Sequence, residues 1–265
     1  MLEFELRGGL GDGFIELHET MAYEETEALG YRDHATVYAI CHNPYLSEIF
    51  RWHPNADRIR VVASPTFFPD YTNTEKRRLS GLPEKSPDRR PARPASPIRF
   101  YPSPEDVRIL RCIPDKPFLA IAASASTCDR NIPDAALRVA VATCEKRGIP
   151  IVTLGRTYKS ALGNKIEPAI SGRDVYDLVD CLSVPGTAEV LKRCRAILTC
   201  HSALLLLSWY ERLPNFTLYT KYHYEKEFAV RSPFSFGKNF PETVHGLIDT
   251  FKPERLTGFI EKNFR

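Results

Sequence analysis

A glycine-rich loop near the amino terminus is the feature that most constrains the fold. Residues 7–13 read Arg-Gly-Gly-Leu-Gly-Asp-Gly, and they lie between an alternating apolar run at 2–6 and an apolar segment that begins at Phe14 and has helical character. Glycine permits positive φ and lets the backbone approach a ligand, so this strand-turn-helix order is typical of an anion site in an α/β protein. The alternative is a plain tight turn in which Asp12 caps the helix.

The carboxylate of Asp12 changes the interpretation of this loop. A negative charge at the mouth of a phosphate-binding loop repels phosphate, so Asp12 suggests a base instead. The glycines also depart from the dinucleotide fingerprint G-x-G-x-x-G, which requires an acid at the end of the second strand. The expected second strand at 36–40 ends in Cys41 and His42. The sequence therefore disfavours a nicotinamide enzyme.

Strands and helices are expected to alternate in both halves of the chain, which predicts α/β units with parallel sheets. The first half has expected strands at 2–6, 36–40 and 58–63. The second half has expected strands at 117–123, 149–154, 179–184, 196–200 and 215–220, and expected helices at 133–146, 187–194 and 204–212. Apolar residues at 244–264 have mostly helical spacing, broken at Pro253. The fold class is thus α/β, with two Rossmann-like domains facing a cleft and a small N-terminal domain.

A segment rich in proline and arginine separates the two halves. It spans residues 64–104, and its composition cannot bury enough apolar surface to form a core. We therefore divide the chain into an N-terminal domain at 1–104 that includes this loop, a C-terminal domain at 105–241 and a helical tail at 242–265. The loop is either a solvated connector or a basic loop that grips an anionic acceptor.

Composition excludes several classes of protein. The net charge of +3 is too small to imply nucleic acid by itself. Seven dispersed cysteines without a C-x-x-C pair indicate reduced thiols and no metal site. No signal peptide is visible, and the apolar runs are far shorter than the roughly 20 residues that span a bilayer. We expect a cytoplasmic protein with no transmembrane segment.

Two further polar clusters follow expected strands of the second half. Residues 124–134 carry hydroxyls and Arg130 at the start of a helix, a setting that suits a diphosphate; the alternative is a helix cap with a solvated arginine. Residues 199–203 place His201, Ser202 and Ala203 at a strand-to-helix turn, which again suits phosphate; the alternative is a structural histidine. Adjacent His201 and Ser202 make a poor nucleophile and base, because neighbouring side chains rarely face each other.

Taken in order, the three clusters resemble the ADP-heptose:lipopolysaccharide heptosyltransferase family of GT-B glycosyltransferases. Residues 7–12 resemble that family's G-x-G-D loop. Residues 129–134 match its acid, basic residue and proline before a helix, with arginine in place of the usual lysine and Ile132 in place of tryptophan. Residues 201–208 with 213–214 resemble its D-[ST]-G-x-x-H turn and G-x-P ending. His201 replaces the aspartate of that turn, and Ala203 replaces the glycine.

The resemblance implies an inverting, metal-independent glycosyltransferase that moves a hexosyl or heptosyl group from a nucleoside diphosphate sugar to an acceptor hydroxyl. Asp12 would be the catalytic base, and Arg130 would neutralise the departing diphosphate. Gly155 would lie near the nucleotide, and Glu189 would contact its ribose. The remaining donor-binding residues would be Gly9, Gly11, Ser126, His201, Ser202 and Ala203. No D-x-D motif is present, so neither a metal nor a cofactor besides the donor is expected.

The acceptor stays open among a glycan, a lipid-linked sugar, a protein and a nucleic acid. The alternative function is a non-catalytic module of the same fold that binds a nucleotide or a sugar phosphate. The departures at His201 and Ala203 are the observation that favours this alternative.

Overall fold

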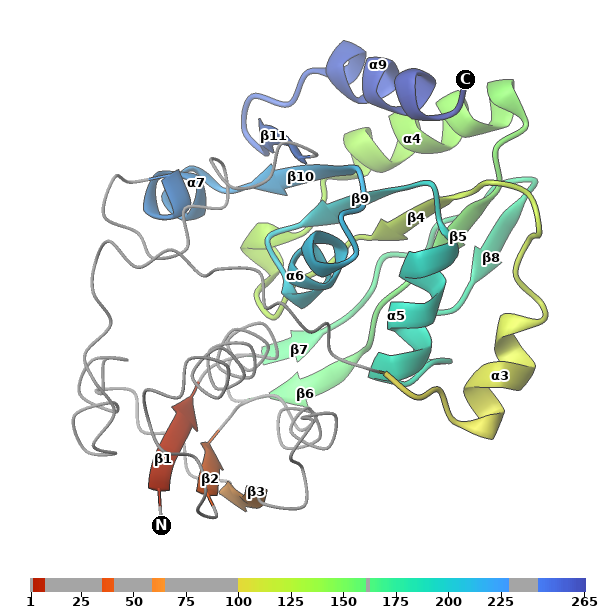
Figure 1. Ribbon diagram of the computed structural model, residues 1–265. Helices are drawn as coiled ribbons and strands as arrows, with labels where there is room; N and C mark the ends of the chain where they lie inside the picture. Colours follow the sequence, from red (N-terminus) through yellow and green to blue (C-terminus); the bar gives the residue numbers. More distant parts are fainter. Residues whose placement is uncertain (1, 8–34, 41–58, 65–99, 161–162, 229–242) are drawn as a thin grey trace. The chain divides into compact units, whose positions relative to one another are not determined.

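The computed structural model describes residues 2–7, 35–40, 59–64, 100–160, 163–228 and 243–265 (Figure 1). The chain divides into two compact units. The first comprises residues 1–99, 160–162 and 231–234, and the second comprises the rest. No helix in the described ranges is long and apolar enough to cross a bilayer.

The first unit contains three parallel strands in the order β1-β2-β3. They are β1 (Leu2–Arg7), β2 (Ala35–Ile40) and β3 (Ile59–Ser64). The three strands predicted in the first half of the chain are thereby confirmed, and so is their parallel pairing, which requires a crossover between each pair. The predicted sites at Gly9, Gly11 and Asp12 lie outside the described residues, and so does the arginine-rich loop.

The second unit is built on a six-stranded parallel sheet in the order β11-β10-β9-β4-β5-β8. Its strands are β4 (Leu119–Ala122), β5 (Ile151–Thr153), β8 (Val175–Asp177), β9 (Ala196–Cys200), β10 (Asn215–Tyr219) and β11 (Thr243–Leu247). Strand order runs outward from β4 in one direction through β5 and β8, and from β9 in the other. The order therefore reverses between β4 and β9, and in open α/β sheets ligands bind outside the carboxyl ends of the strands at such a point.

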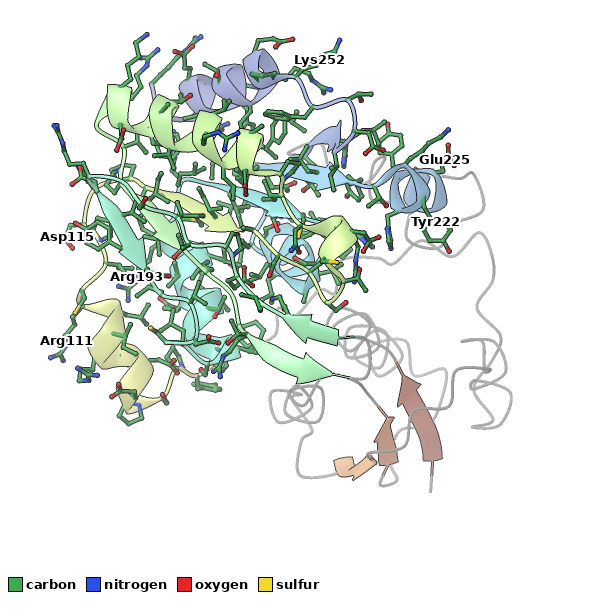
Figure 2. All side chains as sticks on the ribbon, turned by 180° about the vertical axis from the view of Figure 1, so that it is seen from behind. Arg111, Asp115, Arg193, Tyr222, Glu225 and Lys252 are labelled. Atoms are coloured by element: carbon green, nitrogen blue, oxygen red, sulfur yellow. The ribbon has the colours of Figure 1, made fainter. Side chains whose placement is uncertain are left out.

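Helices cover both faces of this sheet (Figure 1). The described helices are α3 (Pro104–Leu110), α4 (Asp134–Arg147), α5 (Val184–Arg193), α6 (Ala203–Tyr210), α7 (Lys221–Phe228) and α9 (Pro253–Asn263). α4 and α9 lie side by side on one face, whereas α5 and α6 lie on the other. Charged side chains such as Glu225 and Lys252 project outward from this layered body (Figure 2).

Alternating side chains of the central strands form two cores. In β4, Leu119 and Ile121 pack into the cluster shared with α4 and α9, where Leu137 and Ile260 are also buried. Ala120 and Ala122, which alternate with them, are equally buried on the opposite face. Strands buried on both faces appear in the sequence as continuous apolar runs, which is why β4 and β9 were predictable.

Two predictions in the second unit were wrong around residue 180. The strand expected at 179–184 lies earlier, at β8, because Asp180 adopts a left-handed φ of 60° that ends the extended run. The helix expected from 187 begins at Val184, because Ser183 caps it by accepting a hydrogen bond from the Gly186 amide at 3.2 Å. Glu189 therefore lies beyond the first turn.

The tail was also predicted wrongly in part. Residues 243–247 form β11, paired in parallel with β10, so the strand predicted at 215–220 is not the last one. Pro253 begins α9 and does not interrupt a helix, because the first helical turn needs no proline N–H. Two short strands, β6 (Tyr158–Ser160) and β7 (Gly163–Lys165), and the helices α3 and α7 were not predicted.

A buried carboxylate joins α3 to α5. Asp106 accepts hydrogen bonds from the amide and hydroxyl of Ser103, both at 2.8 Å, and from those of Ser183, at 2.8 and 2.6 Å. Burial alone raises the pKa of Asp106, but these four bonds outweigh it and lower the pKa below its ordinary value. Gly186 is required there, since a Cβ would lie 2.3 Å from an Asp106 oxygen.

His245 in β11 makes folding sensitive to mild acid. Burial, assisted by the nearby charge of Arg255, lowers the pKa of His245 from 6.5 to about 4. The unfolded chain then binds a proton between these pH values that the folded chain does not. We therefore expect the free energy of unfolding to fall by about 2 kcal/mol as pH decreases from about 6.5 to about 4. Urea unfolding curves across this range measure the loss.

His245→Gln removes the titrating group and should flatten this part of the stability profile. Asp106 does not obscure the comparison, because its lowered pKa stabilises the fold at pH values above 3.8, and this stabilisation is lost only as pH falls further. An equally steep profile in wild type and His245→Gln would contradict the assignment.

Candidate functional site

Two of the predicted clusters meet at the point where strand order reverses. Residues 124–130 follow β4, and residues 201–202 follow the neighbouring strand β9. Arg130 spans the two loops, because its Nη1 donates a hydrogen bond to the carbonyl oxygen of His201 at 3.2 Å. We call this region, at the carboxyl ends of β4 and β9, the switch-point site.

The guanidinium of Arg130 is fixed in place but keeps capacity for a ligand. Its Nε donates to Thr127 Oγ1 at 2.8 Å, and its Nη2 donates to Ser126 Oγ. A guanidinium has five N–H bonds; three are used here, so two remain. No carboxylate of the described residues lies within ion-pair distance of Arg130, which is half-buried. Its positive charge is available to an anion.

The loop that carries Arg130 is held by its own backbone. Ile132 is buried, and its amide donates to the Ala123 carbonyl oxygen at 2.8 Å. Asn131 Oδ1 accepts from the Ala125 amide at 3.1 Å. These bonds return the chain to the end of β4 after a short 3₁₀ turn at Cys128–Arg130. The loop is therefore ordered before any ligand arrives.

Ser124, the second residue after β4, has a buried hydroxyl without a protein partner. The residue is 2% exposed, and its Oγ makes no hydrogen bond to any described residue. Buried polar atoms are nearly always hydrogen-bonded, and leaving one unsatisfied costs about 1–3 kcal/mol. A ligand oxygen or a water at the switch-point site would satisfy it.

Two helices also begin at the switch-point site without a side-chain cap. α4 follows Pro133, and α6 follows Ser202, whose side chain makes no capping bond to the helix. Ala203 is the first residue of α6 and adds one of the open amides. Free amides and the helix dipole both favour an anion at such an end. Together with Arg130 they are the positive groups of this edge, where α4 also carries Asp134 in its first turn.

Gly155 follows β5, but a carboxylate covers it. A Cβ on Gly155 would lie 2.3 Å from Glu167 Oε1, so only glycine fits beneath that side chain. Glu167 in turn pairs with Lys165 Nζ at 2.7 Å, and their side chains are 4% and 12% exposed. Sequence reasoning missed this pair. Side chains two residues apart share one face of a strand, and charged ones usually face solvent. Here the charged side chains of Lys165 and Glu167 are buried, whereas Ile166 between them is 68% exposed.

Glu189 is engaged on its own helix. Its carboxylate lies 3.3 Å from Lys192 Nζ and 3.7 Å from Arg193 Nε. The structure thus gives this acid two cationic partners on α5 and does not place it in the first turn. Its contact with a ribose stays a prediction.

Aromatic rings extend the switch-point site toward β10. The ring centroid of His201 lies 5.5 Å from that of Tyr219 and 4.9 Å from that of His223. His223 Nδ1 is 2.7 Å from Thr220 Oγ1, which holds the ring at the start of α7. His201 is therefore packed through its ring and tied to Arg130 through its carbonyl oxygen. Tyr219 and His223 had no sequence signal of their own.

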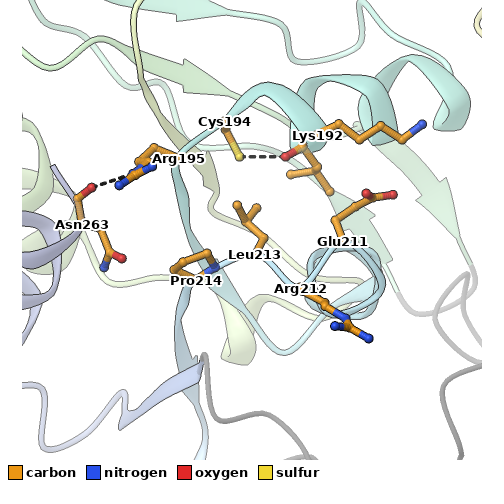
Figure 3. A pocket seen from close by; sticks show the side chains of 9 residues that line it. Lys192, Cys194, Arg195, Glu211, Arg212, Leu213, Pro214 and Asn263 are labelled. Atoms are coloured by element: carbon orange, nitrogen blue, oxygen red, sulfur yellow. Dashed lines mark hydrogen bonds between the residues drawn. The ribbon is translucent and has the colours of Figure 1, made fainter.

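A hollow of about 350 Å³ lies at the opposite edge of the sheet (Figure 3). Its lining includes Arg195, which precedes β9, and Pro214, which precedes β10. The Nε of Arg195 donates to the Asn263 carbonyl oxygen at 3.0 Å. Cys194 in its wall is no ready nucleophile, because burial raises the pKa of its thiol. Amino ends of parallel strands are not where α/β sheets bind substrates.

The part of the chain that the structure describes contains no group of three or more histidine, cysteine, aspartate or glutamate residues placed to hold a metal ion. All six cysteines of that part are free thiols. Burial raises the pKa of Cys144 to about 12, so that thiol stays protonated at neutral pH.

No protein-family model matches the chain, and no curated protein sequence does either. Solved structures do match its fold. The glycosyl transferase family 9 protein from Veillonella parvula has a TM-score of 0.63 at 10% identity, covering 99% of this chain and 97% of that one. The E. coli ADP-heptose lipopolysaccharide heptosyltransferase II has a TM-score of 0.59 at 10% identity, covering 100% and 98%.

The E. coli heptosyltransferase WaaC with ADP has a TM-score of 0.58 at 12% identity, covering 98% of this chain and 99% of that one. Identities this low establish likeness of fold only. The chain therefore has the α/β fold of the heptosyltransferase-like glycosyltransferases, and the resemblance predicted from its sequence is confirmed at that level.

Proposed function

We propose that the chain is a glycosyltransferase that transfers a sugar from a nucleotide sugar to an acceptor hydroxyl, with inversion and without a metal ion. The observation that carries this proposal is Arg130. Its half-buried charge has no acidic partner among the described residues and retains two N–H donors at the point where strand order reverses.

The switch-point site suits the leaving group of such a reaction. Breaking the bond between the sugar and the donor leaves a nucleoside diphosphate whose negative charge grows in the transition state. Arg130, the hydroxyls of Ser124 and Ser126 and the open amides of α4 and α6 are all hydrogen-bond donors to phosphate oxygens. Donors fixed in advance at the place where charge develops stabilise a transition state without a metal.

The other half of the reaction requires a base. Asp12 would remove the proton of the acceptor hydroxyl as its oxygen attacks the anomeric carbon. A single displacement of this kind inverts the configuration at that carbon. The role of Asp12 rests on the resemblance of its loop to the G-x-G-D loop of the heptosyltransferase family.

The names of the similar structures indicate the first donor to test. Two are heptosyltransferases, and one of these was solved with ADP, so ADP-heptose comes first. The panel should also contain ADP-glucose, UDP-glucose, UDP-N-acetylglucosamine and GDP-mannose. We expect release of nucleoside diphosphate from donors of one base, unaffected by EDTA, as measured by chromatography.

A non-catalytic module remains the second candidate, since His201 and Ala203 stand where the family has aspartate and glycine. It predicts that a donor raises the melting temperature but is never cleaved, even with acceptor extracts present. If no donor binds and none is cleaved, both candidates are refuted.

A further inference from the structure

Lys165 and Glu167 form a nearly buried ion pair that none of the predicted roles uses. Lys165 ends β7, and Glu167 follows it with its carboxylate against the backbone of Gly155. The distance from Lys165 Nζ to Glu167 Oε1 is 2.7 Å. Removing two charges from water is costly, so a pair in this position calls for an explanation beyond stability.

The pair lies at the same edge of the sheet as Arg130. Gly155 follows β5, which neighbours β4, so Glu167 stands one strand away from the loop that carries Arg130. The charges of Lys165, Glu167 and Arg130 all act on the thiol of Cys200, at the end of β9. Burial raises the pKa of this thiol to about 11.

Charge balance at this edge gives the pair a role. Arg130 alone offers one positive charge, whereas a diphosphate carries at least two negative charges. The ammonium of Lys165 is a further cation at this edge of the sheet, and in the absence of ligand the Glu167 carboxylate neutralises it. Phosphate oxygens compete with a carboxylate for an ammonium, because both form charge-assisted hydrogen bonds with it.

We propose that Lys165 is a specificity-determining residue that binds the second phosphoryl group of the donor and so selects a diphosphate over a single phosphate. Glu167 holds the ammonium of Lys165 above Gly155 until the donor arrives. This inference rests on the proposed function, because it concerns the leaving group of the same reaction.

Gly155 has a defined part in this arrangement. A side chain at that position would collide with the Glu167 carboxylate and displace the pair from the end of β5. Gly155 thus acts on the nucleotide indirectly. It makes room for Glu167, which positions Lys165.

Titration of inorganic pyrophosphate and of inorganic phosphate into the full chain tests the inference. Lys165→Met should weaken the binding of pyrophosphate about tenfold or more, whereas the affinity for phosphate should change about twofold or less. Glu167→Gln frees the Lys165 ammonium and should strengthen the binding of pyrophosphate severalfold. The double variant Lys165→Met with Glu167→Gln removes the pair without leaving a lone buried charge, and it should bind pyrophosphate as weakly as Lys165→Met. It serves as the test if Lys165→Met does not fold.

The matched control is Lys116→Met. Lys116 pairs with Asp174 at 3.7 Å and donates to the Gly148 carbonyl oxygen, at the amino ends of the strands, and its loss should leave both affinities unchanged. Equal pyrophosphate affinity in wild type and the double variant would overturn the role of Lys165, while the proposed function would stand if Arg130→Met still lost binding. Weaker binding in Glu167→Gln would also overturn it, because the carboxylate would then support binding and would not compete with phosphate for the Lys165 ammonium. No pyrophosphate binding to wild type would overturn both.

Discussion

Replacing Asp12 with asparagine is expected to lower the rate of sugar transfer by about 10²- to 10⁴-fold while the affinity for the donor stays within about twofold. An amide cannot take the proton of the acceptor hydroxyl, but it has nearly the shape of the carboxylate. Loss of the rate without loss of binding is what distinguishes a base from a donor-binding residue. Initial rates with the donor identified by the panel, together with calorimetric titration of that donor, measure both quantities.

Asp115→Asn is the matched control, because Asp115 is an exposed carboxylate in the second unit (Figure 2). It should retain full activity. If Asp12→Asn transfers sugar at the wild-type rate, the base lies elsewhere. The resemblance of the glycine loop to the G-x-G-D loop then does not indicate a catalytic residue. If donor affinity falls together with the rate, Asp12 belongs to the binding site.

Replacing Arg130 with methionine is expected to weaken binding of nucleoside diphosphate by about 100-fold, which corresponds to about 2.7 kcal/mol. The change removes the cation of the switch-point site and also its bonds to Thr127, Ser126 and His201, which hold the two loops together. Calorimetric titration of the nucleoside diphosphate gives the affinity. The matched control is Arg138→Met on the exposed side of α4, which should bind as wild type does.

Arg130→Lys keeps the positive charge but removes the planar set of guanidinium N–H donors. Lysine is the usual residue of the resembling motif, so it should keep part of the affinity, but it cannot bond Thr127, Ser126 and His201 at once. We expect a loss of about tenfold, between wild type and Arg130→Met. Unchanged affinity in Arg130→Met would place the diphosphate away from the switch-point site.

The central strands of the second unit could be predicted because burial on both faces leaves an unbroken apolar run. The six-residue run before Ser124 is of this kind, the run before His201 is broken only by the buried Thr199, and both strands were found. Edge strands give a weaker pattern. β8 is three residues long and only half-buried, and Thr243–Leu247 places a histidine and a glycine within β11, so neither resembles a core strand.

The candidate site was predictable where its residues follow strands directly. The carboxyl ends of parallel strands share one edge of a sheet, so Arg130 and His201 could be assigned to that edge from the sequence. That β4 and β9 are neighbours was visible only in the structure. Lys165 and Glu167 could not, because they reach that edge from β7, whose position depends on tertiary contacts. Ser124 was hidden for another reason: a hydroxyl without a partner is visible only once its surroundings are known.

The central claim is that the carboxyl ends of β4 and β9 bind the diphosphate of a nucleotide sugar. A crystal structure with the preferred nucleoside diphosphate tests it most directly. The account predicts phosphate oxygens within about 3.2 Å of the Arg130 guanidinium and of Ser124 Oγ. A diphosphate bound at the amino ends of the strands, or one that leaves both groups untouched, would contradict it.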